Sequence, residues 1–491
     1  MSIQPWEYLR QFEKQKNLDL DGLIQVYREH WRDESWHEVL CLMARMLDAK
    51  FTGKIIECLI GEDGEAEGFS NLFLAARCLD EVKNRNDIVD VAGRLLVYLK
   101  RLTQDDCTFS IRGERYIEYD KIEYDEFVQE IRIQAVAAVA ATWKDDPETL
   151  HWLKERPQYG DNWIVREGAV KEIARGWKND PETLPLLKEW ARSDDWAVGS
   201  AALQEIVRGW KDDPETLPIL KECVRAEDNF SVQIVALQEI ARGWKDDPET
   251  LPLLKECVRT DDDCFVREAA FQELARGWKD EPETLPLLKE RARSNDHWIV
   301  RKGAVKELAK GWKDDPETLP ILEERARSDD DYQVREAAVR ELARGWKDEP
   351  QTLSILKKLA RSDDNSYVRL AAVEELARGW KDDPETLPIL KERARTDDDS
   401  DVRSAAVQEI ARGWKDDPKL FELLCDVAIN QPLEHQYDFQ DNPRQTALEA
   451  IIELYADRTE TLELVRDRVQ NDSDKQLREF AQQKLVELEG Q

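Results

Sequence analysis

"KDDPETLPILEERARSDDDYQVREAAVRELARGW", residues 313–346, recurs with small changes along most of the chain. Its closing tryptophan marks the units, and neighbouring marks are 34 residues apart except for one step of 33. The marks are Trp143, Trp177, Trp210, Trp244, Trp278, Trp312, Trp346, Trp380 and Trp414. A fixed period of this size is typical of a solenoid, in which each unit buries its apolar face against its neighbours.

The first half of the unit predicts a helix that begins just after an Asp-Pro pair. Asp315 is suited to cap the helix, and Pro316 is suited to the first helical position, where its missing N–H costs nothing. A second proline, Pro320, would remove one backbone hydrogen bond from a helix that begins at Pro316. The helix therefore either bends there or begins near Thr318, and the sequence leaves both open.

The second half of the unit predicts a helix with an apolar stripe. Its members recur at helical spacing and are Val334, Ala338, Val339, Leu342, Ala343 and Trp346. We expect this helix to continue up to the tryptophan, because Thr142 replaces the preceding glycine in the first unit and a β-branched residue disfavours a left-handed helix end. The tryptophans are expected to fill the joints between hairpins.

Composition excludes several classes of function. The 491 residues are 41 % hydrophobic and carry a formal net charge of −33, which repels nucleic-acid phosphates and anionic lipid. We therefore expect no nucleic-acid partner. The eight cysteines form no C-x-x-C pair, and neither a signal-peptide pattern nor a membrane-length apolar run is present. The sequence predicts a cytoplasmic protein without a membrane partner.

Catalytic and cofactor motifs are missing from the sequence. The five histidines form no H-E-x-x-H pattern, so we expect no metal site. The "TGKI" at 52–55 has Ile55 where a nucleotide-binding loop needs Ser or Thr. Carboxylates are so frequent that no pair stands out as an acid–base couple. We predict a protein that is not an enzyme, with no catalytic residues and no cofactor.

A repeated Asp/Arg pair carries a resemblance to HEAT-like repeats. Within a "V-R-x-x-A" context, an Asp stands six residues before an Arg in the pairs Asp261/Arg267, Asp329/Arg335, Asp363/Arg369 and Asp397/Arg403. This resembles the HEAT-like repeats of bilin-lyase subunits over residues 131–418, and the pairs are expected to form an internal ladder between neighbouring units. The fold class is all-α, a right-handed α-solenoid of helical hairpins. Its expected parts are a helical N-terminal region 1–106, the repeat array 107–418 and a helical C-terminal cap 419–491.

Variation between the units is concentrated in a three-residue window after the acidic tract. The windows are NWI 162–164, DWA 195–197, NFS 229–231, DCF 263–265, HWI 297–299, DYQ 331–333, NSY 365–367 and DSD 399–401. Variation at one place in every unit is typical of a recognition surface, and aromatics are enriched in binding hot spots. The expected partner-binding residues are the middle-position aromatics Trp163, Trp196, Phe230, Trp298 and Tyr332. The alternative is that each aromatic packs down as a staple at its helix start.

Two units lack the ladder arginine. Gly199 and Gln233 stand in its place, and the first of these units is one residue short. We expect a local change of superhelical pitch between about residues 195 and 235.

The segment "YREHWRDESWHEVLCLMARMLDAKFTGKIIECL", 27–59, together with the repeats, resembles the region downstream of the ATPase in cyanobacterial NACHT/STAND-type proteins. The chain lacks the ATPase itself. The resemblance implies a non-catalytic sensor or scaffold that recognises a protein or peptide partner in signalling or defence, and an acidic array suits a basic partner. The alternative is a bilin-lyase-like protein that acts on a tetrapyrrole or a phycobiliprotein.

Overall fold

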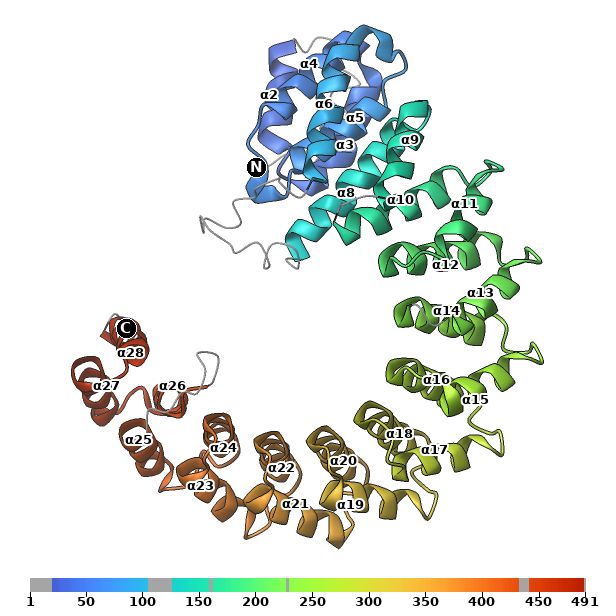
Figure 1. Ribbon diagram of the computed structural model, residues 1–491. Helices are drawn as coiled ribbons and strands as arrows, with labels where there is room; N and C mark the ends of the chain where they lie inside the picture. Colours follow the sequence, from blue (N-terminus) through green and yellow to red (C-terminus); the bar gives the residue numbers. More distant parts are fainter. Residues whose placement is uncertain (1–19, 105–125, 159–161, 227–228, 432–440, 490–491) are drawn as a thin grey trace. The chain divides into compact units, whose positions relative to one another are not determined.

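The computed structural model describes residues 20–104, 126–158, 162–226, 229–431 and 441–489. All regular structure in these residues is helical, and none of them forms a strand (Figure 1). The chain divides into two compact units, Met1–Lys245 (unit 1) and Asp246–Gln491 (unit 2). The all-α solenoid class predicted from the period is confirmed.

Unit 1 begins with helices that precede the repeats and continues with the first hairpins. Short 3-10 helices at Glu65–Glu67, Arg85–Ile88 and Arg156–Gln158 join some of them in the described residues. Its α-helices are α2 (Leu20–His30), α3 (Glu34–Met46), α4 (Ala49–Ile60), α5 (Ser70–Asp80), α6 (Val89–Leu102), α8 (Glu126–Thr142), α9 (Pro147–Glu155), α10 (Trp163–Gly176), α11 (Thr183–Trp190), α12 (Trp196–Trp210), α13 (Thr216–Arg225) and α14 (Phe230–Gly243).

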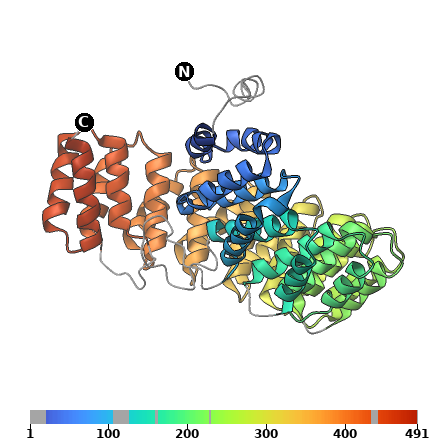
Figure 2. The ribbon, with the colours of Figure 1, turned by 90° about the horizontal axis from the view of Figure 1, so that it is seen from above.

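Unit 2 is built from hairpins throughout its described residues. Even-numbered helices pack on one another in one layer and odd-numbered helices in a second layer, as seen from α16 to α24 in Figure 1. The pairs α25/α26 and α27/α28 are also hairpins, drawn orange to red in Figure 2. The helices are α15 (Thr250–Thr260), α16 (Cys264–Gly277), α17 (Thr284–Arg293), α18 (Trp298–Gly311), α19 (Thr318–Ser328), α20 (Tyr332–Gly345), α21 (Pro350–Ser362), α22 (Ser366–Gly379), α23 (Thr386–Thr396), α24 (Ser400–Gly413), α25 (Leu420–Asn430), α26 (Pro443–Tyr455), α27 (Thr459–Asn471) and α28 (Lys475–Glu489).

Where the second proline is present, the first helix of the hairpin begins at the threonine two residues before it; α25, which has Glu422 in place of that proline, begins at the equivalent Leu420. In α19, where Pro320 is present, the regular helix begins at Thr318. In α21, Ser354 stands in place of that proline, and the helix begins two residues earlier, at Pro350. The restored N–H lets the first turn close, which resolves the choice that the sequence left open.

The predicted apolar stripe of the second helix forms the core. Val334, Ala338 and Leu342 are fully buried, and Trp346 is 8 % exposed. The helix ends at Gly345 without a left-handed glycine, as predicted, because Trp346 takes the C-cap position. The tryptophans lie at the joints between hairpins, and the lysine that follows one tryptophan lies over the next, as Lys313 does over Trp346 at 5.9 Å.

The arginine ladder links several hairpins to the following one. Arg335 donates to the backbone carbonyl of Asp329 in its own unit (2.8 Å) and to the carboxylate of Asp363 in the next (2.9 and 3.1 Å). The predicted ladder is therefore present, but the carboxylate partner lies 28 residues downstream instead of six upstream. The same 28-residue pairing recurs in Arg301–Asp329, Arg369–Asp397 and Arg444–Asp472, whereas Arg166 and Arg267 pair with acids 29 residues downstream, Asp195 and Asp296.

Two ladder acids, Asp329 and Asp397, have pKa values below the usual range. Burial alone would raise the pKa of the Asp329 carboxyl, but hydrogen bonds from Arg301 and a backbone N–H outweigh it and hold that pKa below its usual value. The pKa of Asp397 is lowered in the same way, against its burial, by Arg369. Among the described residues the Asp261 carboxylate accepts no arginine side chain, and burial raises its pKa. The arginine thus offsets the desolvation of the Asp329 and Asp397 carboxylates.

The two units without the ladder arginine make other contacts. A Cβ at Gly199 would lie 2.8 Å from Cγ2 of Val232, so α12 and α14 approach each other closely there. Gln233 donates from Nε2 to the carbonyl of Val224 (3.2 Å). The predicted change of pitch between 195 and 235 stays a prediction.

Candidate functional site

A helix cap positions each variable window. The first window residue is the N-cap of the second helix, and its side chain accepts a backbone N–H from the first turn, as Asn162 does from Ile164 (3.0 Å) and Asn365 from Tyr367 (2.9 Å). Because the cap fixes the first turn, the other two window residues are always the first two residues of the helix. Variation therefore changes side chains on a constant backbone.

The five predicted partner-binding residues all begin a helix. Trp163, Trp196, Phe230, Trp298 and Tyr332 are the first residues of α10, α12, α14, α18 and α20. Trp196 and Phe230 are each 46 % exposed, whereas the other three are partly buried. That they bind a partner stays a prediction.

Rings from neighbouring hairpins contact one another. The centroids of Trp163 and Trp196 are 5.2 Å apart, and those of Tyr332 and Tyr367 are 5.6 Å apart. Trp298 contacts His297 at 5.5 Å, and the Lys302 ammonium lies 5.4 Å from its ring centroid. The rings therefore pack against neighbouring side chains and still present area to solvent, so the packing and binding interpretations are compatible.

Two window aromatics stand outside the middle position. Where that position is Cys264 or Ser366, the third window residue is aromatic, and Phe265 and Tyr367 are 44 % and 55 % exposed. The signal was present in the sequence, because every window from 162 to 367 contains one aromatic. We call these residues the aromatic rows, which are Trp163, Trp196 and Phe230 in unit 1 and Phe265, Trp298, Tyr332 and Tyr367 in unit 2.

The last window has a different environment. Ser400 is only 3 % exposed, and Asp401 accepts the backbone N–H of Asp441 (2.9 Å). The Asp401 side chain in this window is therefore hydrogen-bonded to the segment that follows α25. The unit 2 row ends at Tyr367.

Exposed carboxylates accompany the unit 2 row. Asp330 and Asp364 each lie two residues before the middle of a window, and their side chains are 89 % and 88 % exposed. Each is hydrogen-bonded to a ladder arginine, as Asp364 is to Arg335 at 2.5 Å, which holds the carboxylate in place. Its other lone pairs remain open to solvent.

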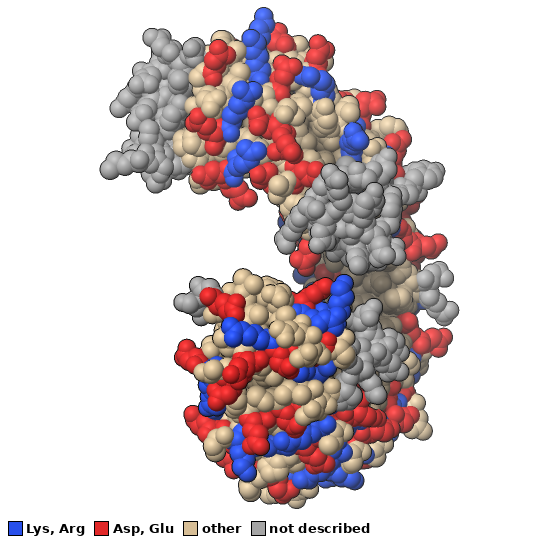
Figure 3. Space-filling view, turned by 90° about the vertical axis from the view of Figure 1, so that its left-hand side faces the viewer, with Lys and Arg blue, Asp and Glu red and all other residues tan. Residues whose placement is uncertain are grey.

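The aromatic rows and the carboxylates beside them are suited to binding a ligand. Aromatic faces beside fixed carboxylates attract cations and flat apolar groups. In the described part of the chain, groups of His, Cys, Asp or Glu that could hold a metal ion are absent. No helix there is long and apolar enough to cross a membrane. On the face drawn in Figure 3, acidic and basic side chains are interspersed.

Comparison with known proteins identifies the repeats. A family model for HEAT repeats matches residues 150–241, 251–343 and 319–411, more than half of the chain. A comparison with curated protein sequences finds no match.

Several solved structures are similar in fold. The structure of YibA from Escherichia coli has 19 % identity and a TM-score of 0.36, with 54 % of this chain and 90 % of YibA covered. Kap95p, solved with RanGDP, has 14 % identity and a TM-score of 0.45, with 96 % of this chain and 66 % of Kap95p covered. A mutant Kap121p has 15 % identity and a TM-score of 0.43, and the 96 % of this chain that aligns spans 54 % of Kap121p.

Proposed function

The chain belongs to the HEAT repeat family, and we propose that it is a protein-binding scaffold whose aromatic rows hold an extended basic segment of a partner protein. The observation that carries the proposal is one partly or largely exposed aromatic in each window from 162 to 367, held on a capped helix start. Aromatics are the commonest hot-spot residues of protein interfaces.

The charge around the rows favours a basic segment. Asp330 and Asp364 flank the unit 2 row with exposed carboxylates, and the whole chain carries −33. Lysine or arginine side chains of a partner would contact a ring and a carboxylate together. The Lys302 ammonium over Trp298 shows the ring part of this contact within the chain itself.

The spacing favours an extended segment. Packed helices lie about 8–10 Å apart, and an extended chain advances about 3.3 Å per residue. One partner residue in about every three would therefore meet a successive ring. The four rings of the unit 2 row would then take a segment of about 12 residues.

A pair of peptides tests the proposal. A fluorescein-labelled peptide of about 12 residues, with arginine at every third position among serine and glycine, should bind the full chain. The matched peptide with glutamate at those positions should bind at least about tenfold more weakly, because charge complementarity contributes to recognition. Anisotropy titrations at low and high salt measure both. Equal affinities for the two peptides, or none for either, would reject the proposal.

A further part of the proposal is the biological system in which the scaffold works. We propose that the scaffold serves as the sensor arm of a NACHT-type signalling or defence system, supported by the resemblance of residues 27–59. Action on a tetrapyrrole or a phycobiliprotein stays the alternative.

A further inference from the structure

Helix α21 differs from α19, α23 and α27 in one contact to the ladder acid. In α19, Arg325 adds a second guanidinium to the ladder acid four residues on, with its Nη1 3.1 Å from Oδ2 of Asp329. Arg393 and Arg468 do the same for Asp397 (3.3 Å) and Asp472 (3.1 Å). In these hairpins an arginine from the first helix completes the hydrogen bonding of a carboxylate whose side chain is fully buried.

In α21 the corresponding residue is Leu359, so Asp363 lacks this partner. Oδ1 of Asp363 accepts from Arg335 and from the N–H of Asn365. Among the described residues, Oδ2 accepts only from Nε of Arg335 (3.1 Å). A carboxylate oxygen has room for two donors, so one acceptor position is open.

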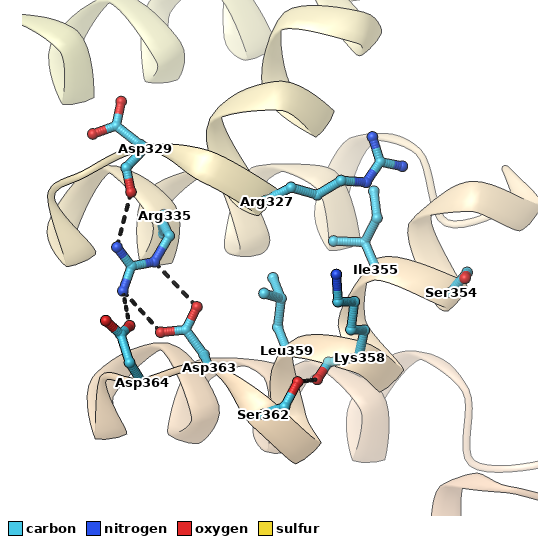
Figure 4. Close-up of a pocket in the computed structure, with 10 residues that line it drawn as sticks. All are labelled: Arg327, Asp329, Arg335, Ser354, Ile355, Lys358, Leu359, Ser362, Asp363 and Asp364. Carbon is cyan, nitrogen blue, oxygen red and sulfur yellow. Dashed lines mark hydrogen bonds and ion pairs between the residues drawn. The ribbon is translucent and has the colours of Figure 1, made fainter.

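A cavity of about 380 Å³ lies where that arginine would be. Ile355 and Leu359 form its apolar part, and Asp363, Asp364 and Ser362 lie at one end (Figure 4). The shorter leucine leaves the space that a guanidinium occupies in α19, because leucine ends at its δ-carbons.

Two basic side chains lie on the side of the cavity away from Asp363 and Asp364, with Lys358 between Leu359 and Ile355 and Arg327 beside Ile355 (Figure 4). Both Lys358 and Arg327 are exposed. Arg327 pairs with Glu323 at 3.2 Å, and Lys358 forms no ion pair with the described residues. Lys358 itself is a departure, because the corresponding residue of α19 is Glu324.

We propose that this cavity, between α19 and α21, binds an arginine side chain of a partner chain that carries an acidic residue next to that arginine. The guanidinium donates to Oδ2 of Asp363 and to the Ser362 hydroxyl, and its methylene groups lie on Ile355 and Leu359. The neighbouring acidic residue pairs with Lys358 and Arg327. Two guanidiniums on one ladder carboxylate are already the rule at Asp329 and Asp397.

The cavity binds arginine and not lysine because of the positions of its hydrogen-bond acceptors. The rungs of the other hairpins place a planar N–H donor beside Oδ2 while the rest of the guanidinium reaches further acceptors, as Arg325 reaches Glu324. A planar fork provides these directions, whereas an ammonium is a compact and strongly hydrated charge. The site uses none of the aromatic-row residues, so it stands or falls separately from the proposed function.

The test compares two capped peptides on the full chain by calorimetry. One has a single arginine followed by an aspartate among glycines, and the other has citrulline, a neutral isostere, in place of the arginine. The arginine peptide should bind weakly, with a Kd on the order of 1 mM, and the citrulline peptide at least about tenfold more weakly.

Two variants locate the binding. Leu359→Arg restores the rung of the array itself and should abolish binding of the arginine peptide, whereas Leu359→Met keeps the apolar volume and should leave binding within about twofold. Equal affinity for the two peptides, no binding by the native chain, or full binding by Leu359→Arg would overturn the proposal. The peptide comparison on the native chain decides the matter even if the arginine variant fails to fold.

Discussion

Replacing Arg369 by methionine should lower the free energy of unfolding of unit 2 by about 3 kcal/mol. The guanidinium is 7 % exposed and the Asp397 side chain fully buried, so the substitution leaves a buried carboxylate with fewer donors. Methionine keeps the packing of the methylene groups of the arginine side chain, so the loss of stability measures the contribution of the charge. Urea unfolding followed by circular dichroism measures it, as a lower midpoint or a separate early transition.

Two further variants make this result specific. Arg378→Met removes an arginine that is 59 % exposed and pairs with Glu375, and it should cost less than about 1 kcal/mol. Arg369→Met combined with Asp397→Asn should recover part of the loss, because the buried charge is removed as well. A loss for Arg369→Met no larger than that for Arg378→Met would show that the ladder does not stabilise the array.

At acid pH the difference in free energy of unfolding between the native chain and the Arg369→Met variant should become smaller. In the native chain the pKa of Asp397 lies below its unfolded value, so its stabilising contribution is present above about pH 4 and is lost as pH falls through the folded pKa. Without Arg369, burial should raise that pKa, as it does at Asp261. The variant should therefore lose less stability than the native chain between pH 5 and pH 3, and parallel pH profiles would contradict this.

Replacing Trp196, Phe265 and Tyr367 together by alanine should weaken binding of the basic peptide by about 100-fold or more. These are row members that are 44 to 55 % exposed, and truncation of an aromatic hot spot typically costs at least about 2 kcal/mol. Most of the lost ring area faces solvent, so the far-UV spectrum should stay unchanged and the melting temperature should fall only slightly. Anisotropy titration of the peptide measures the binding.

The chain offers a matched control for this substitution. Phe51, Tyr98 and Phe127 are 39 to 44 % exposed and lie outside the rows. Their triple alanine variant loses a similar aromatic area and should bind the peptide like the native chain. If both triple variants lose affinity equally, the rows have no special part in binding; if the row variant unfolds, the aromatics serve packing.

The repeat architecture could be predicted because one pattern recurs at a fixed period. Each unit carries an acidic residue before a proline, which is Asp-Pro in most units and Glu-Pro at 281–282 and 349–350, together with the apolar stripe and the closing tryptophan, so repetition supports an assignment that one unit alone would leave weak. The helix start at Thr318 could also have been predicted. The units at 144–177 and 347–380 have His151 and Ser354 where the units between 178 and 414 otherwise have the second proline, and their helices begin earlier, at Pro147 and Pro350.

The partners of the ladder could not be predicted from spacing alone. An arginine such as Arg335 has one aspartate six residues upstream and an equivalent one 28 residues downstream, and a periodic sequence makes the two indistinguishable. The structure uses both, the backbone carbonyl of Asp329 and the carboxylate of Asp363. Only the stacking of hairpins decides which group of each aspartate faces the arginine.

The aromatic rows were predicted in part. Five members follow from the middle window position, whereas Phe265 and Tyr367 stand one residue later, where a helix turns by about 100° per residue. That Tyr367 still meets Tyr332 depends on how the two rings lean between helices. How much of each ring faces solvent depends on the neighbouring hairpin, which no single window specifies.

Photo-crosslinking is the most direct test that the rows bind the partner segment. Benzoylphenylalanine placed at Phe265 or Tyr367 should form covalent adducts with the basic peptide upon irradiation. The same group placed at Glu392, an exposed position on α23, should form almost none. Adducts at the row positions and not at α23 are the predicted result, and adducts at α23 with none at the rows would contradict the account.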